Sequence, residues 1–530
     1  MDKKYVIAYD VGTTGVKTCV FAVSDSIELL GYASEGYNLY IEDDGSAEQD
    51  PDEWWEAMRI TTDKAIRAAD ISADLIEGIS FCSQMQGFVG VDKDGRHVHR
   101  AFSYMDQRAR EELKKGIAHG VQIAGANVFK LLKSLKITGA VAASVKDPVW
   151  KYKWLEANRP EEFARVHKWL DVKESLIARM TGEFVMTPDS AFGTELYDIR
   201  KGEFSPEMLD MLGVKHEHMP KIVQCTEKVG GLTEQAAKDL GLKPGTAVFG
   251  GGGDASLIGI GAGAVGMGDT HVYSGTSGWV GTVVDKSVVD ATAMIAAIVS
   301  ADAGKFLYFA ELETAGKCLE WVKDHLALDE IGIYLEKKDV SESYESKYRS
   351  LYDYMTEVVA TVPAGSNGVI FTPWLHGNRC PFEDPNARGI FFNIGLNTGK
   401  SDMIRSVLEG VCYHLRWFIE TQDKKVQTSS VLRFVGGGAL SPLTCQILAD
   451  VTGRKVETVD SPQNVGAVGA AVLMAVGLGL IEKVEDAKKL IPVVKTFTPN
   501  MENKKVYDKM FEVYKRLYSS NKKNFADLNE

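Results

Sequence analysis

Cysteine is scarce in this sequence, with seven residues among 530, and no two of them form a Cys-x-x-Cys pair. An odd and dispersed set of cysteines excludes a disulfide framework and indicates free thiols in a reducing compartment. His97/His99 and His216/His218 are spaced two apart, but no cysteine or carboxylate cluster in a metal-ligand pattern accompanies them. The sequence therefore disfavours a histidine-based metal site.

The sequence also lacks a membrane-spanning run and a surplus of positive charge. Its most apolar late stretch, 467–481, is too short and too rich in glycine to span a bilayer. The N-terminal residues run directly into a strand pattern, without the form of a signal peptide. Lys and Arg number 60 against 73 Asp and Glu, a formal net charge of −13, which argues against nucleic acid as the main partner. We therefore expect a cytoplasmic protein with no membrane and no nucleic acid partner.

Common nucleotide-binding signatures are missing as well. No G-x-x-x-x-G-K-[ST] segment occurs, which excludes a P-loop, and the protein-kinase signature set is absent. Gly261, Gly263 and Gly266 match G-x-G-x-x-G, but they follow a predicted helix, whereas a dinucleotide-binding fold needs a strand, a turn and then a helix. A nucleotide would have to bind through other turns.

The sequence does contain two similar hairpin patterns. Residues 5–10 and 16–23 read as strands around the turn 11–15, Val-Gly-Thr-Thr-Gly. Residues 269–285 repeat this plan, with a strand that leads into Gly-Thr-Ser-Gly and back into an apolar strand. Two hairpins with the same hydroxyl-rich turn form a weak internal repeat, which predicts two similar domains that face each other.

The first turn has side chains that suit a phosphate. Its glycines free backbone N–H groups, and the hydroxyls of Thr13 and Thr14 can donate to the same phosphate oxygens. Lys17 can neutralise the charge of a transferred phosphoryl group, and Asp10 can hold Mg²⁺. An ordinary polar hairpin would have the same composition, so the turn alone leaves both interpretations open.

A third glycine turn adds a further nucleotide-binding candidate. Residues 431–437 predict a buried strand, 438–442 a turn, and 443–453 a helix that ends at Gly453. The N-terminal N–H groups of such a helix form a ready site for an anion or a nucleotide.

A single carboxylate lies within a glycine-rich segment in the middle of the chain. Asp254 follows four glycines, 250–253, and precedes a predicted helix at 255–260. The boundary between the halves is predicted at 255–268, where glycine allows close approach and motion. Other expected elements are helices at 105–120, 161–180, 231–241 and 500–521, and a charged, mostly helical insertion at 320–360.

Short motifs occur in a fixed order along nearly the whole chain: D-V-G-T-T (10–14), E-Q-D-P-D-E-W-W (48–55), S-Q-M-Q-G (83–87), Y-M-D-Q-R (104–108), K-Y-K-W-L (151–155), G-G-G-D-A (251–255), S-G-T-S-G (274–278), T-A-G-K-C-L-E-W (314–321), D-P-N-A-R-G (384–389), V-L-E-G-V (407–411) and G-G-G-A-L-S-P-L (436–443). Together they resemble the FGGY family of carbohydrate kinases, within the actin-like fold of sugar kinases and heat-shock ATPases. Within that family the pattern is most similar to the xylulokinase type.

This resemblance implies an α/β protein with two actin-like (ribonuclease H-like) domains and an ATP cleft between them. Residues 1–256 would form the N-terminal, sugar-binding domain, and residues 257–530 the C-terminal, nucleotide-binding domain with a helical tail. ATP and Mg²⁺ are the implied cofactors, and a small-molecule sugar is the implied partner. The oligomeric state stays open, with a homodimer among the options.

The resemblance also assigns site residues. Asp254 matches the catalytic base that accepts the proton of the attacking sugar hydroxyl, and it would also suit the N-cap of the predicted helix. Asp10 is the expected metal ligand. The sugar site is matched by Gln86, Asp106, Asp254 and Ala255, and the ATP site by Thr13, Thr14, Lys17, Thr276, Gly316, Glu320, Gly438 and Ser441. Glu320 equally suits a solvated helix face, and the Trp54–Trp55 pair is expected to pack in the core.

D-xylulose is the expected substrate, with departures from the pattern at three positions. The xylulokinase type usually has His where this chain has Gln86, often has Asn where it has Ala255, and tends to have Glu where it has Asn378. Kinases for ribulose, glycerol or gluconate are the alternatives. A non-catalytic, actin-like sugar sensor is a further one, against which the retention of Asp10, Lys17 and Asp254 argues.

Overall fold

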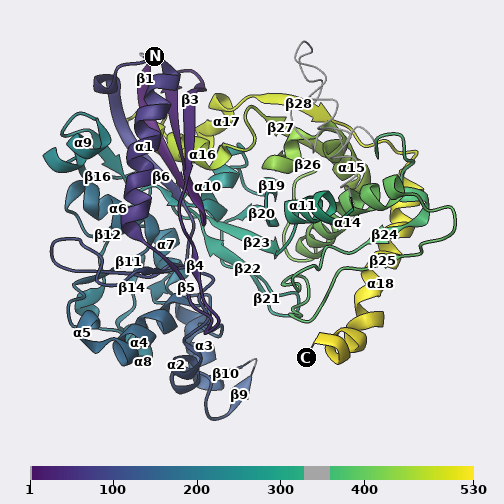
Figure 1. The fold of residues 1–530 in the computed structure, drawn as a ribbon, viewed down its shortest axis with the longest axis horizontal. Coiled ribbons are helices and arrows are strands. Elements are labelled where there is room, and N and C mark those ends of the chain that lie inside the picture. The colour runs from purple at the N-terminus through teal and green to yellow at the C-terminus, as the bar shows by residue number, and fades with distance from the viewer. Residues whose placement is uncertain (1–2, 124, 327–358, 530) are drawn as a thin grey trace.

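The computed structural model describes residues 3–123, 125–326 and 359–529. Two β-sheets lie side by side, one from the N-terminal half of the chain and one from the C-terminal half (Figure 1). The first sheet has the strand order β16-β17-β6-β1-β2-β3, and β18 also pairs with β6. Its strands are β1 (Lys4–Val11), β2 (Gly15–Val23), β3 (Ile27–Gly36), β6 (Ile76–Ser83), β16 (Lys228–Gly231), β17 (Ala247–Phe249) and β18 (Gly252–Gly253).

The second sheet repeats the plan of the first. Its order is β21-β22-β23-β20-β19-β26-β27-β28. Its strands are β19 (Thr270–Ser274), β20 (Gly278–Val284), β21 (Val289–Asp290), β22 (Ile295–Val299), β23 (Phe306–Leu312), β26 (Val431–Val435), β27 (Lys455–Val459) and β28 (Val493–Phe497). β1 is antiparallel to β2 and parallel to β6, just as β19 is antiparallel to β20 and parallel to β26. Both predicted hairpins, and the repeat that they indicated, are confirmed.

Helices cover both faces of the first sheet, which explains why its central strands read as nearly continuous apolar runs. One face packs against α1 (Pro51–Ala69), α6 (Val172–Thr181) and α9 (Glu234–Leu240). Trp54 and Trp55 are buried in this layer, as expected. The other face packs against α10 (Asp254–Gly261) and α16 (Val465–Gly477).

α10 and α16 cross between the two sheets, and glycine permits their contact (Figure 1). A Cβ atom at Gly469 would lie 2.2 Å from the carbonyl oxygen of Leu257, and one at Gly261 would lie 1.8 Å from that of Val465. Any larger residue would force the helices apart. Because α10 begins at Asp254, this crossing connects the predicted base to the C-terminal half.

The second sheet has its own helical layer on the side away from α10. The layer consists of α11 (Gly316–His325), α14 (Lys400–Gln422), α15 (Pro442–Thr452) and α18 (Lys504–Asn529). β26 and α15 confirm the predicted strand, turn and helix, and the left-handed Gly453 ends α15 as expected. α18 confirms the predicted C-terminal helix and extends it. Most of the expected insertion at 320–360 lies outside the described residues.

A smaller helical layer packs around its own core beneath the first sheet, and two predictions are wrong here. Only Arg110–Gly116 of the expected helix 105–120 is helical. The expected helix 161–180 is broken by β11 (Lys168–Leu170), because this segment pairs with β7 (Val89–Val91) and buries Trp169. The predicted helix 231–241 is confirmed as α9. The helices of the layer are α2 (Arg110–Gly116), α3 (Val128–Ile137), α4 (Pro148–Asn158), α5 (Pro160–Phe163) and α8 (Pro206–Leu212). α7 (Pro188–Gly193) packs in a small separate cluster with Met186 and Tyr197.

Short elements complete the described fold. They are β4 (Tyr40–Ile41), β5 (Ala47–Gln49), β8 (Ala101–Phe102), β9 (Gln122–Ile123), β10 (Ala126–Asn127), β12 (Val185–Met186), β13 (Tyr197–Asp198), β14 (Glu203–Phe204), β15 (Lys221–Ile222), β24 (Ile370–Phe371), β25 (Phe391–Phe392) and α17 (Ala487–Leu490). The domain division expected between residues 256 and 257 falls inside α10, so the precise domain limits stay a prediction.

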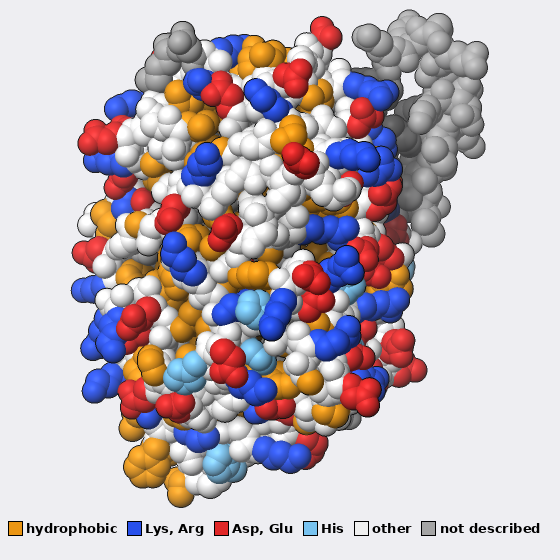
Figure 2. All heavy atoms as spheres, turned by 90° about the vertical axis from the view of Figure 1, so that its left-hand side faces the viewer, with side chains coloured by type: hydrophobic (Ala, Val, Ile, Leu, Met, Phe, Trp, Pro, Cys, Tyr) orange, Lys and Arg blue, Asp and Glu red, His pale blue; other side chains and the backbone are white. Residues whose placement is uncertain are grey.

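The cysteines and the surface add two observations. All seven cysteines are buried and free, as expected. On the outer face of the N-terminal half, Lys and Arg side chains are interspersed with Asp and Glu, and this face has no large field of one sign (Figure 2). In the part of the chain that the structure describes, no helix has both the length and the apolar character needed to cross a membrane.

Gly469→Ala tests the helix crossing. We expect it to lower the free energy of unfolding by about 1–3 kcal/mol, because the added methyl group overlaps the backbone of α10. Gly395→Ala is the matched control, since a Cβ atom at Gly395 would meet nothing within 4 Å. Urea unfolding followed by tryptophan fluorescence measures both variants. An unchanged midpoint for Gly469→Ala would contradict the packing of α10 on α16.

Candidate active site

The carboxyl ends of three neighbouring strands meet at one place. β1 and β18 flank β6, and Asp10 of β1 and Gly252 of β18 both pair with Cys82 of β6. Asp254 follows Gly252 by two positions, at the start of α10. The sheet therefore holds the predicted metal ligand and the predicted base at the same level, on either side of one strand.

The Asp254 carboxylate is partly buried at this edge. Its Oδ1 accepts a 2.7 Å hydrogen bond from the backbone N–H of Ala255, while Gly253, not Asp254, takes the N-cap position. Burial raises the pKa of Asp254 to about 7, and the charges of Asp10 and Glu311 act in the same direction. A carboxylate with a pKa close to neutral is better matched to general-base catalysis than an ordinary aspartate is.

Asp254 is positioned by a buried charge network that the sequence did not reveal. The backbone N–H of Gly253 donates a 2.7 Å hydrogen bond to Oδ2 of Asp189 on α7. Asp189 is fully buried, and its Oδ1 lies 4.0 Å from the buried ammonium of Lys173. The sequence signal is weak, because Lys173 and Glu174 stand in a helix in which half of the residues are polar or charged.

Gln86 lies on a loop beside the base. Met85 packs so closely on Gly253 that a Cβ atom at Gly253 would lie 2.1 Å from its Sδ. Gln86 has a left-handed backbone, φ 61°, which is strained for a residue other than glycine. Two bonds hold it: its N–H donates to Asp171 at 3.0 Å, and its carbonyl accepts from Lys151 at 2.8 Å. Its side-chain amide has no protein partner among the described residues, so it is free to bind a sugar hydroxyl.

Asp106 and Ala255 make different contributions from Gln86. Asp106 is almost fully buried, and its Oδ2 accepts the N–H of Ala47 and pairs with the Arg108 guanidinium, each at 2.9 Å. Arg108 also pairs with Glu48 at 2.7 Å. Asp106 thereby fixes two segments of the site wall to each other, and its direct contact with a sugar stays a prediction. Ala255 follows the base and has no polar side-chain atom.

The first hairpin turn offers free backbone donors. The N–H of Gly12 donates to the carbonyl of Gly15 at 2.9 Å, whereas those of Thr13 and Thr14 have no protein acceptor in the described chain. The Thr13 hydroxyl lies 3.4 Å from the hydroxyl of Tyr104. The turn therefore fits phosphate oxygens, as the sequence predicted.

Asp10 and Lys17 lie opposite each other in the same hairpin. The Lys17 ammonium donates to the carbonyl of Gln463 at 3.0 Å, just before α16. Burial raises the pKa of Asp10 above its ordinary value. A Cβ atom at Gly466, in the first turn of α16, would lie 3.5 Å from Oδ2 of Asp10. A hard carboxylate oxygen beside a phosphate turn fits Mg²⁺, which Asp10 would hold directly or through water.

The second hairpin turn lies against the third glycine turn. The N–H of Thr276 has no acceptor within the described residues. Gly316, at the start of α11, approaches this turn so closely that a Cβ atom would lie 2.4 Å from the carbonyl of Gly275. A Cβ atom at Gly438 would lie 2.9 Å from Oγ of Ser274. The structure thus brings together the predicted nucleotide positions that lie far apart in the sequence.

The remaining ATP candidates belong to α15 and α11, and Tyr273 lies near Asp254. Ser441 caps α15, and Glu320 is exposed on α11. The Tyr273 ring packs on Gly275, and burial raises its pKa, with smaller contributions from Asp254 and Asp10. Tyr273, which leads into the second turn, therefore lies within electrostatic reach of both carboxylates.

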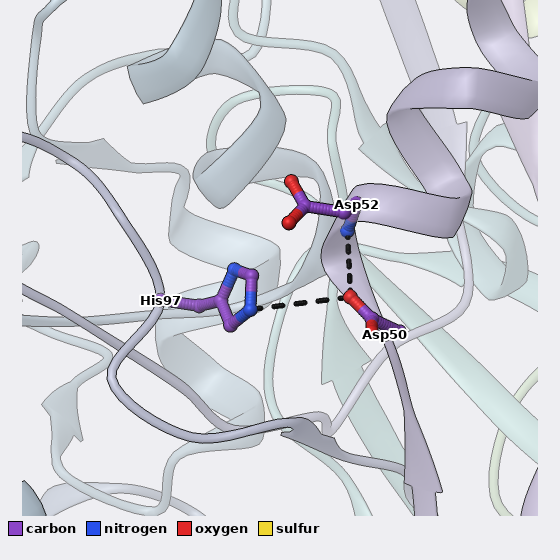
Figure 3. A group of neighbouring side chains, drawn as sticks. All are labelled: Asp50, Asp52 and His97. Carbon is purple, nitrogen blue, oxygen red and sulfur yellow. Dashed lines mark hydrogen bonds and ion pairs between the residues drawn. The ribbon is translucent and has the colours of Figure 1, made fainter.

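Another cluster in the structure consists of side chains of the types that can ligate a metal ion. Asp50, Asp52 and His97 each offer an atom within 4.8 Å of the others (Figure 3). Asp50 caps α1 by accepting the N–H of Asp52 at 2.9 Å, and Asp52 pairs with Arg179 at 2.5 Å. His97 and Asp52 also line a cavity of about 630 Å³. Both carboxylates already have protein partners, so the group carries no assignment.

These features define a class of protein: a two-domain α/β kinase with hydroxyl-rich turns from both halves and a partly buried aspartate, Asp254, at the edge of the first sheet. The chain belongs to the FGGY family of carbohydrate kinases, whose N-terminal domain matches residues 5–261 and whose C-terminal domain matches residues 271–478. The resemblance that the motifs indicated is confirmed, and with it the two-domain fold and the enzyme class.

Similar proteins share the fold but differ in their named sugar. A xylulose kinase of Staphylococcus epidermidis is 28% identical over 529 residues, covering 100% of this chain and 99% of the relative. The ligand-bound crystal structure of xylulose kinase from Lactobacillus acidophilus has a TM-score of 0.84 at 26% identity and covers 99% of this chain and 100% of its own. The structure of gluconate kinase from the same species has a TM-score of 0.83 at 26% identity, with the same coverage.

Asp254→Asn tests the base. We expect kcat to fall by about 10²–10⁴-fold, because the amide keeps the shape but cannot accept a proton. Sugar binding should weaken much less, since the amide still bonds a hydroxyl. Asp285→Asn, at an exposed position, is the control. Steady-state kinetics with the best sugar measures both, and near-normal turnover by Asp254→Asn would rule out its role as the base.

The pH dependence of kcat tests the raised pKa of Asp254. Below about pH 7 the carboxyl group becomes protonated and can no longer accept a proton. We therefore expect kcat to fall about tenfold for each pH unit below that value and to level off above it. Asp254→Asn should lose this dependence. A profile that is flat between about pH 5.5 and pH 8 would contradict this assignment.

Proposed function

We propose that the protein transfers the γ-phosphoryl group of ATP to a hydroxyl of D-xylulose. The observation that carries the proposal is the position of Asp254, which follows the contact of Gly253 with the Met85–Gln86 loop and lies across β6 from Asp10 of the first hairpin. Free thiols are in keeping with a cytoplasmic enzyme.

The proposed chemistry needs few groups. The sugar hydroxyl oxygen attacks the γ-phosphorus, the bond from phosphorus to the bridging oxygen of ADP breaks, and the hydroxyl proton passes to Asp254. The N–H groups of Thr13, Thr14 and Thr276 bind phosphate oxygens, and Lys17 stabilises their charge. Mg²⁺ neutralises phosphate charge when it is bound near Asp10.

Gluconate is the second candidate substrate, because a gluconate kinase of known structure is as similar to this chain as a xylulose kinase. Xylulose kinase and gluconate kinase of Lactobacillus acidophilus have the same identity to this chain. D-xylulose is favoured by the motif pattern, while the Asp254 and Gln86 side chains suit the hydroxyl groups that both compounds carry. A sugar sensor without activity is disfavoured, because burial and neighbouring charges prepare Asp254 for proton transfer.

A coupled assay of ADP release tests the proposed function. The panel is D-xylulose, D-ribulose, L-ribulose, glycerol and D-gluconate, each with ATP and Mg²⁺. We expect D-xylulose to have the highest kcat/KM, and ATP hydrolysis without sugar to be slow. Asp254→Asn serves as the inactive control. A higher kcat/KM for gluconate would overturn the substrate, and no turnover with any sugar would overturn the proposed function.

A further inference from the structure

A second group of buried charges lies beyond Gln86. Lys151, on α4, is completely buried and donates to the Gln86 carbonyl. Its charge interacts with the carboxyl group of Asp106, described above, and with those of Asp147, Asp171 and Glu195. We call Lys151 and the last three acids the Lys151 cluster. The reaction proposed above uses none of its side chains.

Glu195 is the member of the cluster with an unsatisfied oxygen. It is only 5% exposed, and its buried Oε2 has no hydrogen-bond partner within the described residues. Asp171, in contrast, accepts backbone N–H groups with both oxygens. An unpaired, buried carboxylate oxygen is costly, and native structures keep one mainly where a ligand or water satisfies it.

The backbone at Glu195 is strained as well. Its φ is 58°, and that of Gln86 is 61°, so two residues other than glycine adopt the left-handed conformation at adjoining positions. Such a conformation costs about 1–3 kcal/mol and concentrates at functional sites. Strain together with an unpaired oxygen indicates that Glu195 is held in place for a ligand.

The cluster adjoins the loop that also contacts the base. A Cβ atom at Gly193, two residues before Glu195, would lie 3.3 Å from Cγ of Gln86. At the other end of the loop, Met85 packs on Gly253, next to Asp254. The loop of Met85 and Gln86 therefore contacts the segment of Asp254 at one end and the segment of Glu195 at the other.

The charges of the cluster disfavour an anionic ligand. One ammonium group, that of Lys151, faces several carboxyl groups. Burial lowers the pKa of Lys151 to about 8, raises that of Asp147 to about 7, and raises that of Glu195 well above its usual value. Arg379 approaches Asp147 from the C-terminal half, but it pairs with Glu311 at 2.8 Å. Both cations are thus engaged by protein groups, so the desolvation of a ligand carboxylate would go uncompensated here, whereas a hydroxyl would satisfy the free oxygen of Glu195.

We propose that Glu195 is a specificity-determining residue, whose free oxygen binds a hydroxyl at the end of the sugar remote from the phosphorylated one. The site then accepts a neutral polyhydroxy sugar and rejects a sugar acid. This inference rests on the proposed function, which it deepens.

Kinetics of Glu195→Leu provide the first test. We expect KM for D-xylulose to rise about 10–100-fold, the effect of losing a hydrogen bond to a charged or polar buried partner, while kcat and KM for ATP stay within about twofold. Glu203→Leu, an exposed glutamate on β14, is the matched control and should leave all three constants unchanged. An unchanged KM for D-xylulose in Glu195→Leu would overturn the proposal.

Thermal shift provides a second test that does not need turnover. Without ligand, Glu195→Gln should melt at the same temperature as the wild type or higher, because it removes a buried and uncompensated acid. D-xylulose should raise the melting temperature of the wild type more than that of the variant, and D-gluconate should not raise that of the wild type. A larger wild-type shift with gluconate would overturn the inference. Wild-type binding of D-xylulose without ADP release would overturn the proposed function alone.

Discussion

The crossing of α10 and α16 is the constraint on which the rest of the structure depends. Gly261 and Gly469 let the two helices touch backbone to backbone between the sheets, which joins both halves in one apolar core. α10 starts at Asp254. The carbonyl of Gln463, just before α16, accepts a hydrogen bond from the Lys17 ammonium. The same contact thus sets Asp254, the first hairpin turn and the C-terminal half relative to one another, so the geometry of the proposed site follows from helix packing.

Burial then sets the chemistry of the groups that the crossing brings together. Asp10 and Asp254 lie on either side of β6, where burial raises the pKa of both and the charge of Asp10 raises that of Asp254 further. Phosphoryl transfer depends mainly on position and charge, and a desolvated site strengthens every charge within it. The hydrogen bond from the Gly253 N–H to the buried Asp189 holds the backbone next to Asp254, and this contact helps to fix the orientation of the Asp254 carboxylate.

On the proposed sugar side of the site, buried charged side chains hold the backbone of Gln86 in place. Asp171 and Lys151 fix Gln86 in a left-handed conformation from opposite sides, through its N–H and its carbonyl. Asp106 is engaged by Arg108 and by the backbone of Ala47, so it shapes the wall. Related kinases of named but different sugars share this fold, so the fold alone does not distinguish the sugars, and individual side chains of the site must do so.

Sequence alone determined the local elements and the class of chemistry. The glycine and threonine turns after Asp10 and Tyr273, the strand–turn–helix that ends at Gly453, and the family motifs are all local patterns, because turn and cap preferences act over a few residues. Tertiary structure decided the rest. The strand of Trp169 replaced a predicted helix through pairing with a distant segment. Glu195 and Lys151, 44 positions apart by number, became neighbours only through folding, since burial, pKa and unpaired oxygens depend on which distant atoms pack around a group.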